Sequence, residues 1–175
     1  WGYCASEPEV SQASQQQFEG GFMVWIAKYD QIWVYTNSDK RLQKFTDTFV
    51  SGVDPVSSSN IVPPAGRLQP EFGFGKVWRN NPMVREALGW ATHTPNNYET
   101  VNQGNATDFR NQQHFLRLAN GNVLLHEVFT GVMQDVSAYS NINGFAHPRN
   151  GFRVPSGGGC VIPPSGPWPP CATGG

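Results

Sequence analysis

One hydrophobic hairpin pattern occurs twice in this chain, and it constrains the fold more than any other feature. The first copy spans residues 17–35 and the second spans residues 113–126. In both copies a Gln-x-Phe opening leads into an apolar run, a polar turn follows, and a second apolar run returns. Two apolar runs joined by a polar turn are typical of a β-hairpin. The repetition therefore predicts two degenerate copies of one hairpin-containing unit.

The first copy is apolar on both faces of its strands. Phe22 and Val24 would lie on one face, and Met23 and Trp25 on the other. A strand that is apolar on both faces is typical of one that is covered on both sides. We therefore expect this hairpin at the centre of a sheet, with residues 42–50 as the candidate third strand.

The second copy carries the strongest turn signal in the chain. Its strands are expected at residues 113–118 and 122–129, and Asn120 and Gly121 lie between them. An Asn-Gly pair favours a two-residue type I′ turn, because both central residues of that turn need positive φ.

One short helix is predicted between the two copies. Asn81 is suited to the N-cap, Pro82 to the first helical position, and Gly89 to the residue that ends the helix. The expected buried stripe consists of Val84, Ala87 and Leu88.

The rest of the chain reads as connections. Ser and Pro clusters interrupt residues 51–70, amides dominate residues 91–112, and Gly and Pro dominate from about residue 143 onward. The expected organisation is a first hairpin repeat at residues 1–70, a second repeat with the helix at 71–142, and a Gly/Pro-rich, Cys-containing tail at 143–175. The expected fold class is a β-rich α+β fold.

Charge and hydropathy exclude two classes of partner. Charged residues make up 14% of the chain and the net charge is −1, so the basic stripe that nucleic acid needs is missing. No run of about 18 apolar residues is present, so no membrane span is expected. The chain begins with Trp, which favours a processed product.

The three cysteines lie near the ends of the chain, at Cys4, Cys160 and Cys171. Cysteines flanked by Gly and Pro favour disulfides over core packing, although the sequence leaves the pairing open. The odd thiol is either free or paired with another chain. An oxidising location, secreted or at the cell surface, is therefore expected.

The sequence favours a protein without catalytic, cofactor-binding or metal-binding residues. No Gly-x-Ser-x-Gly elbow is present, and the carboxylates cannot be placed as a pair. His114 and His126 fall on facing strands of the second hairpin, but two ligands do not make a metal site. A structural or solvent-exposed role is the favoured interpretation of these histidines.

Aromatic residues among amides are the candidates for contact with a glycan or a protein partner. Trp25 and Trp78 are expected in the core, because tryptophan buries a large apolar area. Trp33 and Tyr35 share one strand face and are the aromatics most expected to be exposed. The candidate contact residues are Trp33, Tyr35, Trp90 and Trp168.

The first copy resembles a repeat of secreted and envelope proteins of filamentous bacteria. The resemblance rests on Phe18-Glu19-x-Gly21-x-Met23-x-Trp25, on Ile32-x-Val34 and on Phe45-x-Asp47-Thr48-Phe49. It continues in the segments Gly73 to Trp78 and Leu88 to Ala91, and is looser in the second copy. The pattern is more distantly similar to LGFP-type repeats of bacterial cell-wall proteins.

The resemblance implies an extracellular repeat associated with surfaces, and it supplies no catalytic residue. With the low charge and the terminal cysteines, it favours a non-catalytic structural protein that self-assembles into a homo-oligomer, filament or layer. The alternative is a carbohydrate-binding module of a bacterial envelope protein, with a cell-wall or extracellular polysaccharide as its partner.

Overall fold

A computed structural model describes residues 9–105, 113–128 and 130–135 of this chain. Eight strands and two helices form within these residues. The chain divides into two compact units, with boundaries between Val10 and Ser11 and between Thr100 and Val101. The first, called the N-terminal unit, is Ser11–Thr100, and the C-terminal unit contains the described residues from Val101 onward together with Glu9 and Val10. Each unit is described by itself.

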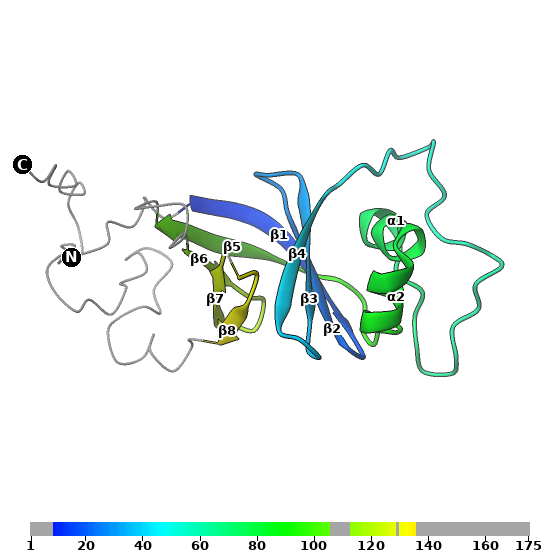
Figure 1. The fold of residues 1–175 in the computed structure, drawn as a ribbon. Coiled ribbons are helices and arrows are strands. Elements are labelled where there is room, and N and C mark those ends of the chain that lie inside the picture. The colour runs from blue at the N-terminus through cyan, green and yellow to red at the C-terminus, as the bar shows by residue number, and fades with distance from the viewer. Residues whose placement is uncertain (1–8, 106–112, 129, 136–175) are drawn as a thin grey trace, which may run out of the picture. The chain divides into compact units, whose positions relative to one another are not determined.

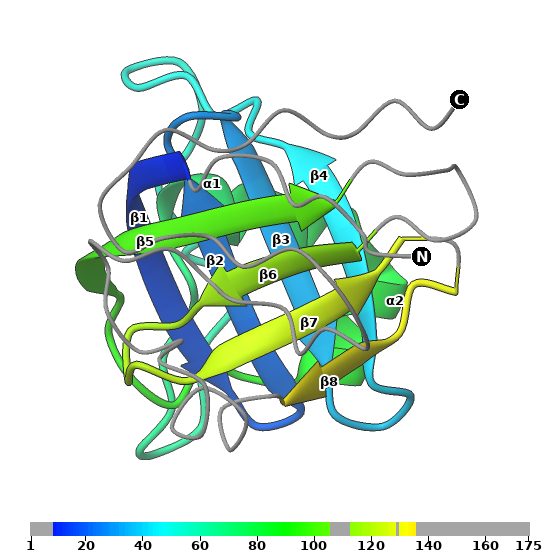
Figure 2. The ribbon, with the colours of Figure 1, turned by 90° about the vertical axis from the view of Figure 1, so that its left-hand side faces the viewer.

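The N-terminal unit contains an antiparallel meander in the order β4-β3-β2-β1 (Figure 2). Its strands are β1 (Glu9–Phe18), β2 (Gly21–Ile26), β3 (Gln31–Thr36) and β4 (Arg41–Thr46). Strands β2 and β3 lie inside the meander, and most of their side chains are buried on both faces. The predicted central hairpin is therefore confirmed. The third strand is confirmed as β4, although it ends at Thr46 and not at the predicted residue 50.

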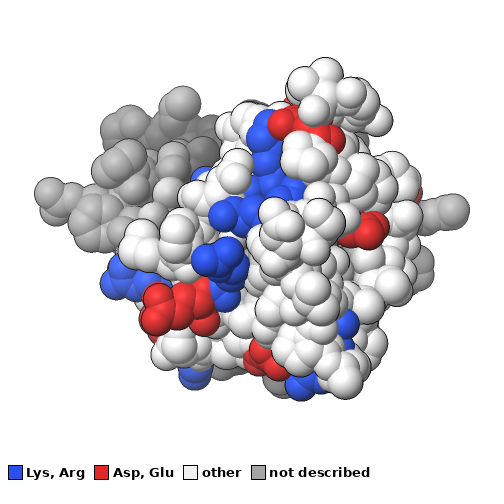
Figure 3. Space-filling model, turned by 90° about the vertical axis from the view of Figure 1, so that its right-hand side faces the viewer, with Lys and Arg blue, Asp and Glu red and all other residues white. Residues whose placement is uncertain are grey.

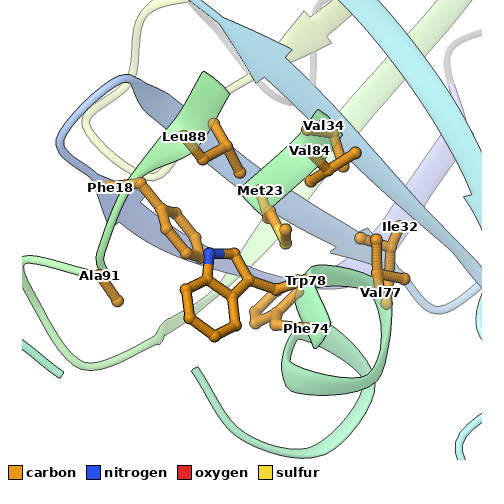
Figure 4. Packing of buried hydrophobic residues seen from close by; sticks show 10 residues of the cluster. All are labelled: Phe18, Met23, Ile32, Val34, Phe74, Val77, Trp78, Val84, Leu88 and Ala91. Atoms are coloured by element: carbon orange, nitrogen blue, oxygen red, sulfur yellow. The ribbon is translucent and has the colours of Figure 1, made fainter. Parts of the chain in front are cut away.

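Two helices, α1 (Phe72–Asn80) and α2 (Pro82–Leu88), pack on one face of this meander (Figure 1). Met23 and Val34 pair across β2 and β3 and point toward the helices, where Trp78 of α1 and Leu88 of α2 meet them (Figure 4). The buried cluster consists of Phe18, Met23, Ile32, Val34, Phe74, Val77, Trp78, Val84, Leu88 and Ala91. Trp78 is therefore in the core, as predicted, and Trp25 packs at its edge.

Helix α1 was not predicted from the sequence, because Gly73 and Gly75 lower the helix propensity of its first turn. The structure gives both glycines a packing reason. A Cβ on Gly73 would lie 2.6 Å from the Asp47 carboxylate, and one on Gly75 would lie 2.4 Å from the Pro70 carbonyl oxygen. Asp47 and Pro70 approach the first turn of α1 so closely that these two positions require glycine.

Helix α2 follows its prediction, with two corrections. Pro82 opens it and Gly89 ends it in the left-handed region, at φ 66°. Asn81 does not cap α2 with its side chain, since its Nδ2 donates to the Val77 carbonyl of α1 at 2.7 Å. Ala87 is exposed rather than part of the buried stripe.

The C-terminal unit continues from the second half of β5 (Asn96–Asn105) in the order β5-β6-β7-β8 (Figure 2). The other strands are β6 (Gln113–Arg117), β7 (Val123–Glu127) and β8 (Met133–Asp135). The predicted second hairpin is confirmed as β6–β7.

The turn of this hairpin differs from the predicted type I′. The Leu118 N–H donates to the Asn122 carbonyl at 2.8 Å, and the Gly121 N–H donates to the Leu118 carbonyl at 2.9 Å. Gly121 has a φ of 86°, whereas Asn120 does not have a positive φ. The loop therefore has three residues, with a type I turn followed by glycine in the left-handed region.

Strand β5 occupies Asn96–Asn105 within the long polar loop that was predicted at residues 91–112, and β1 was likewise missed. Both strands bury amide side chains, including Gln15 and Gln16 of β1 and Asn102 and Gln103 of β5. The Gln16 Nε2, for example, donates to the His93 carbonyl at 3.0 Å. This hydrogen bond offsets part of the cost of burying the Gln16 amide. Buried amides also remove the apolar alternation by which a sequence reveals a strand.

The β-rich α+β fold class is confirmed. The predicted division after residue 70 differs from the one observed, since the hairpin of the first repeat and the helices that follow it lie in one unit. The reason is the shared core, in which helix residues cover the sheet residues.

Gly20 gives the sharpest test of how the helices dock on the meander. A Cβ on Gly20 would lie 2.0 Å from the Ala87 carbonyl oxygen, so Gly20→Ala forces backbone to move. We expect a loss of about 3 kcal/mol in unfolding free energy, the upper range for overpacked sites, measured by urea denaturation.

Gly66→Ala is the matched control. Gly66 has a φ of 75° and open space around it, so only the left-handed conformation costs free energy, about 1 kcal/mol. Equal losses in the two variants would contradict the tight contact at Gly20.

Candidate functional site

Exposed apolar side chains occur along the connection between β4 and α1 and at the first residue of α1. The exposed fractions are 53% for Val50, 79% for Val53, 40% for Val56 and 53% for Phe72. We call these four residues the Val–Phe surface. Large apolar side chains at this exposure are individually ordinary, but several on one stretch of chain are a candidate interaction surface.

Backbone hydrogen bonds fold the first part of this surface into a compact turn. The N–H groups of Val53 and Asp54 donate to the Val50 carbonyl at 3.1 and 2.9 Å. The Val50 N–H donates in return to the Asp54 Oδ2 at 2.8 Å. The turn is closed at both ends, so Val50 and Val53 are held in a defined position.

Two basic side chains of α1 fasten this turn to the helix. The Lys76 Nζ donates to the Thr48 carbonyl and to the Asp54 Oδ2, both at 2.7 Å. The Arg79 guanidinium donates to the Pro55 carbonyl at 2.7 Å and to the Val56 carbonyl at 3.2 Å. The hydrogen bond from Lys76, followed by that from the Val50 N–H, lowers the pKa of Asp54.

Phe72 completes the surface in an unfavourable backbone conformation. It has a φ of 51°, which is rare for a bulky residue and costs of order 1–3 kcal/mol. Its N–H donates to the Val56 carbonyl at 3.1 Å, and its ring meets the edge of Phe49 at 5.7 Å between ring centres. A strained aromatic residue that remains half exposed points to a role beyond folding.

The start of α1 is positioned by a partly buried carboxylate. Asp47 lies against Gly73 in the first turn of the helix, and its Oδ1 accepts the Phe49 N–H at 3.0 Å. Burial raises the pKa of Asp47, with a further contribution from the charge of Asp30. Its role is to join β4 to α1.

Figure 3 looks onto the side of the N-terminal unit on which Figure 1 shows α1, α2 and the long connection. Uncharged side chains cover most of this side, and Lys and Arg gather near its middle (Figure 3). Neither acidic nor basic residues dominate it, so a strongly charged partner is not favoured.

A second polar cluster lies where the β1–β2 turn meets the end of α2. The Glu19 Oε1 accepts the Arg67 Nε–H at 2.6 Å, and its Oε2 accepts the Trp90 N–H at 3.0 Å. The hydrogen bond from Trp90, followed by that from Arg67, lowers the pKa of Glu19. Trp90 is half-buried and packs on Trp78, with ring centres 5.2 Å apart.

The predicted contact aromatics have different outcomes. Trp33 is 1% exposed, with the Lys44 Nζ 4.0 Å above its ring, so the expectation of exposure is wrong for this residue. Tyr35 is half-buried and stacks on Phe22 at 4.9 Å. The remaining predicted site residues, Trp168, Cys4, Cys160 and Cys171, lie outside the described residues.

Sequence reasoning missed the Val–Phe surface. Its valines stand in a segment of Gly, Ser, Asp and Pro that follows no strand or helix periodicity. Apolar residues in such a segment were the available signal, because a connection without regular structure has little core to fill.

Within the described part of the chain, no group of three or more His, Cys, Asp or Glu side chains gathers. Neither α1 nor α2 has the length and apolar character needed to cross a bilayer.

Lys76→Met tests whether α1 holds the Val50–Asp54 turn. Without the ammonium, Asp54 and the Thr48 carbonyl lose their shared donor, and the turn should open more often. We expect hydrogen exchange at the Val53 and Asp54 amides to rise by roughly tenfold. Lys40→Met, at an exposed hairpin position, is the control; a similar rise there would contradict a specific fastening.

Glu19→Gln tests the polar cluster through its pH dependence. Because the pKa of Glu19 is lowered in the folded state, its charge stabilises the fold above the unfolded-state pKa. This stabilisation is lost as the pH falls through the folded-state pKa, which lies on the acid side of the ordinary value for glutamate. We expect the variant to melt at a lower temperature at pH 7 and the difference to vanish in acid. Glu86→Gln on α2 is the control, and a pH-independent difference would argue against the mechanism.

Comparison with known proteins gives no relative: no family model, no curated protein and no solved structure matches this chain. The resemblance to bacterial envelope repeats therefore stays a prediction from the motif residues.

Proposed function

We propose that this protein is a non-catalytic extracellular building block that self-associates through the Val–Phe surface. One observation carries the proposal: Val50 and Val53, on a segment that is fastened to α1, and Phe72, at the start of α1, are more than half exposed. A segment held in this way keeps its apolar side chains in water when the protein is alone.

The apolar area provides the driving force for association. Fully burying a valine or phenylalanine side chain contributes roughly 1.5–3 kcal/mol relative to leaving it exposed. Four such side chains provide several kcal/mol, and the fastened turn reduces the ordering cost that association would otherwise carry.

A second copy of the chain is the partner that the charges favour. A two-fold contact brings the same surface from each copy together and doubles the apolar side chains that it buries. With a net charge of −1 and only 14% charged residues, two copies repel each other weakly. Association of identical chains is therefore not opposed electrostatically.

Three further parts of the proposal, namely the repeat, the role of the cysteines and the location, are supported by the sequence. The two hairpin-containing units are degenerate copies of one repeat, and the terminal cysteines stabilise a secreted or cell-surface assembly in the form of a filament or layer. The resemblance to envelope repeats supports a bacterial surface location.

Carbohydrate binding is the alternative function, and the observation that favours it is the Glu19 cluster. Trp90 offers part of an indole ring beside the Glu19–Arg67 pair, whose side chains are 40% and 39% exposed. An aromatic ring beside charged hydrogen-bonding groups is suited to a sugar. Carbohydrate binding would rest on one aromatic residue, Trp90, whereas self-association rests on four exposed apolar residues. Self-association is therefore the preferred proposal.

Light scattering coupled to size-exclusion chromatography tests the proposal, with reductant present so that disulfides do not contribute. We expect assemblies that grow with protein concentration in the wild type. Val53→Ser and Phe72→Asn should shift the protein toward the 19.3 kDa monomer. The asparagine also tolerates the positive φ, so its folding stability should not fall by more than about 1 kcal/mol.

Met83→Gln is the matched control, because Met83 is 81% exposed but belongs to α2. A wild-type protein that stays monomeric at all concentrations would overturn self-association, and so would assemblies unchanged in Val53→Ser and Phe72→Asn. In those cases, retention on polysaccharide that Trp90→Ala abolishes would support the alternative.

A further inference from the structure

The C-terminal unit places three potential metal ligands in one row across three neighbouring strands. His114 of β6 pairs with His126 of β7, and His126 pairs with Met133 of β8. Side chains of directly paired residues lie on the same face of a sheet and are immediate neighbours. Two imidazoles and one thioether are therefore adjacent.

The two imidazole rings are spaced as a shared metal ion requires. Their centres are 6.3 Å apart, with the ring planes inclined by 66°. Two metal–imidazole bonds of about 2.0–2.1 Å plus the two ring radii place the ring centres about 6 Å apart when one ion lies between them. The observed ring spacing is therefore close to that of two imidazoles on one ion.

The surroundings of this row are apolar. Met133 is 2% exposed and His126 is 4% exposed, while His114 is partly exposed. Leu116 and Leu124, two residues along β6 and β7, are buried on the same face. The partly exposed His114 provides a route by which an ion enters from solvent.

We propose that His114, His126 and Met133 bind monovalent copper. A thioether is a soft ligand that favours Cu(I), and imidazole is also suited to copper. All three ligands are neutral, so they do not compensate the charge of a divalent ion, which makes its burial costly. Calcium and magnesium require oxygen ligands and are disfavoured in this row.

The histidine pair alone did not suffice for a site, and Met133 changes this. The third potential ligand of this row is a methionine, which joins the two histidines on the same face of the sheet. Each imidazole has two nitrogens, so each ring can bind the ion through one and keep a hydrogen bond through the other. The row is therefore compatible with the other interactions of these histidines.

The test is a Cu(I) titration of the full-length protein without oxygen, after the cysteines are reduced and blocked with N-ethylmaleimide. A chromophoric Cu(I) chelator as competitor reports the affinity. We expect one equivalent of Cu(I) to bind. X-ray absorption should show two nitrogen ligands at about 2.0 Å and one sulfur ligand at about 2.3 Å.

Met133→Leu is the decisive variant, because it removes the sulfur and nearly conserves the side-chain volume. We expect Met133→Leu to fold and to bind Cu(I) at least tenfold more weakly than the wild type does. The same result is expected for His114→Gln. His93→Gln, at an exposed position of the N-terminal unit, is the matched control and should bind like the wild type.

Three results would overturn the site: no Cu(I) bound after the cysteines are blocked, wild-type affinity in Met133→Leu, or tighter binding of Zn²⁺ than of Cu(I). Val53→Ser should keep the wild-type affinity, because the copper site uses none of the Val–Phe surface. The outcome is therefore independent of whether the protein self-associates.

Discussion

The N-terminal unit depends on the contact between the β1–β2 turn and the carboxyl end of α2. The Gly20 N–H donates to the Leu88 carbonyl at 2.8 Å, and the Glu19 N–H donates to the Trp90 carbonyl at 3.1 Å. The Trp78 indole N–H donates to the Gly89 carbonyl at 2.8 Å. The end of a helix leaves carbonyls without partners, and here the sheet and α1 satisfy those around the end of α2. The same bonds fix both helices on the core.

This contact also controls what the protein presents to its surroundings. Since it fixes α1, it fixes Lys76 and Arg79, and these two side chains hold the turn that carries Val50 and Val53. The exposed valines are thus connected to the core by a short series of hydrogen bonds. A surface prepared in this way loses little conformational entropy on association, which a freely moving loop would lose.

The sequence predicted those elements in which the local pattern of apolar, Pro and Gly residues matches the observed burial and the observed ends of the element. The apolar runs of β2 and β3, and Pro82 and Gly89 at the ends of α2, are of this kind. Strands β1 and β5 bury amides, and α1 begins with glycines that serve close packing, so local patterns point away from the observed structure. The Val–Phe surface depends on hydrogen bonds distant in sequence. The His–Met row depends on the pairing of β8, a strand of three residues that no periodicity reveals.

The residues that carry the resemblance to envelope repeats are occupied mainly with folding. Phe18, Met23 and Trp78 are buried in one core, Glu19 and Gly21 shape the turn beside it, and Asp47 joins β4 to α1. The buried residues of the motif are not available to bind a partner, and the alternative carbohydrate site uses the partly exposed Glu19 and Trp90. Self-association instead needs exposed side chains that the fold positions but does not use in its core. The Val–Phe surface meets this condition in the N-terminal unit.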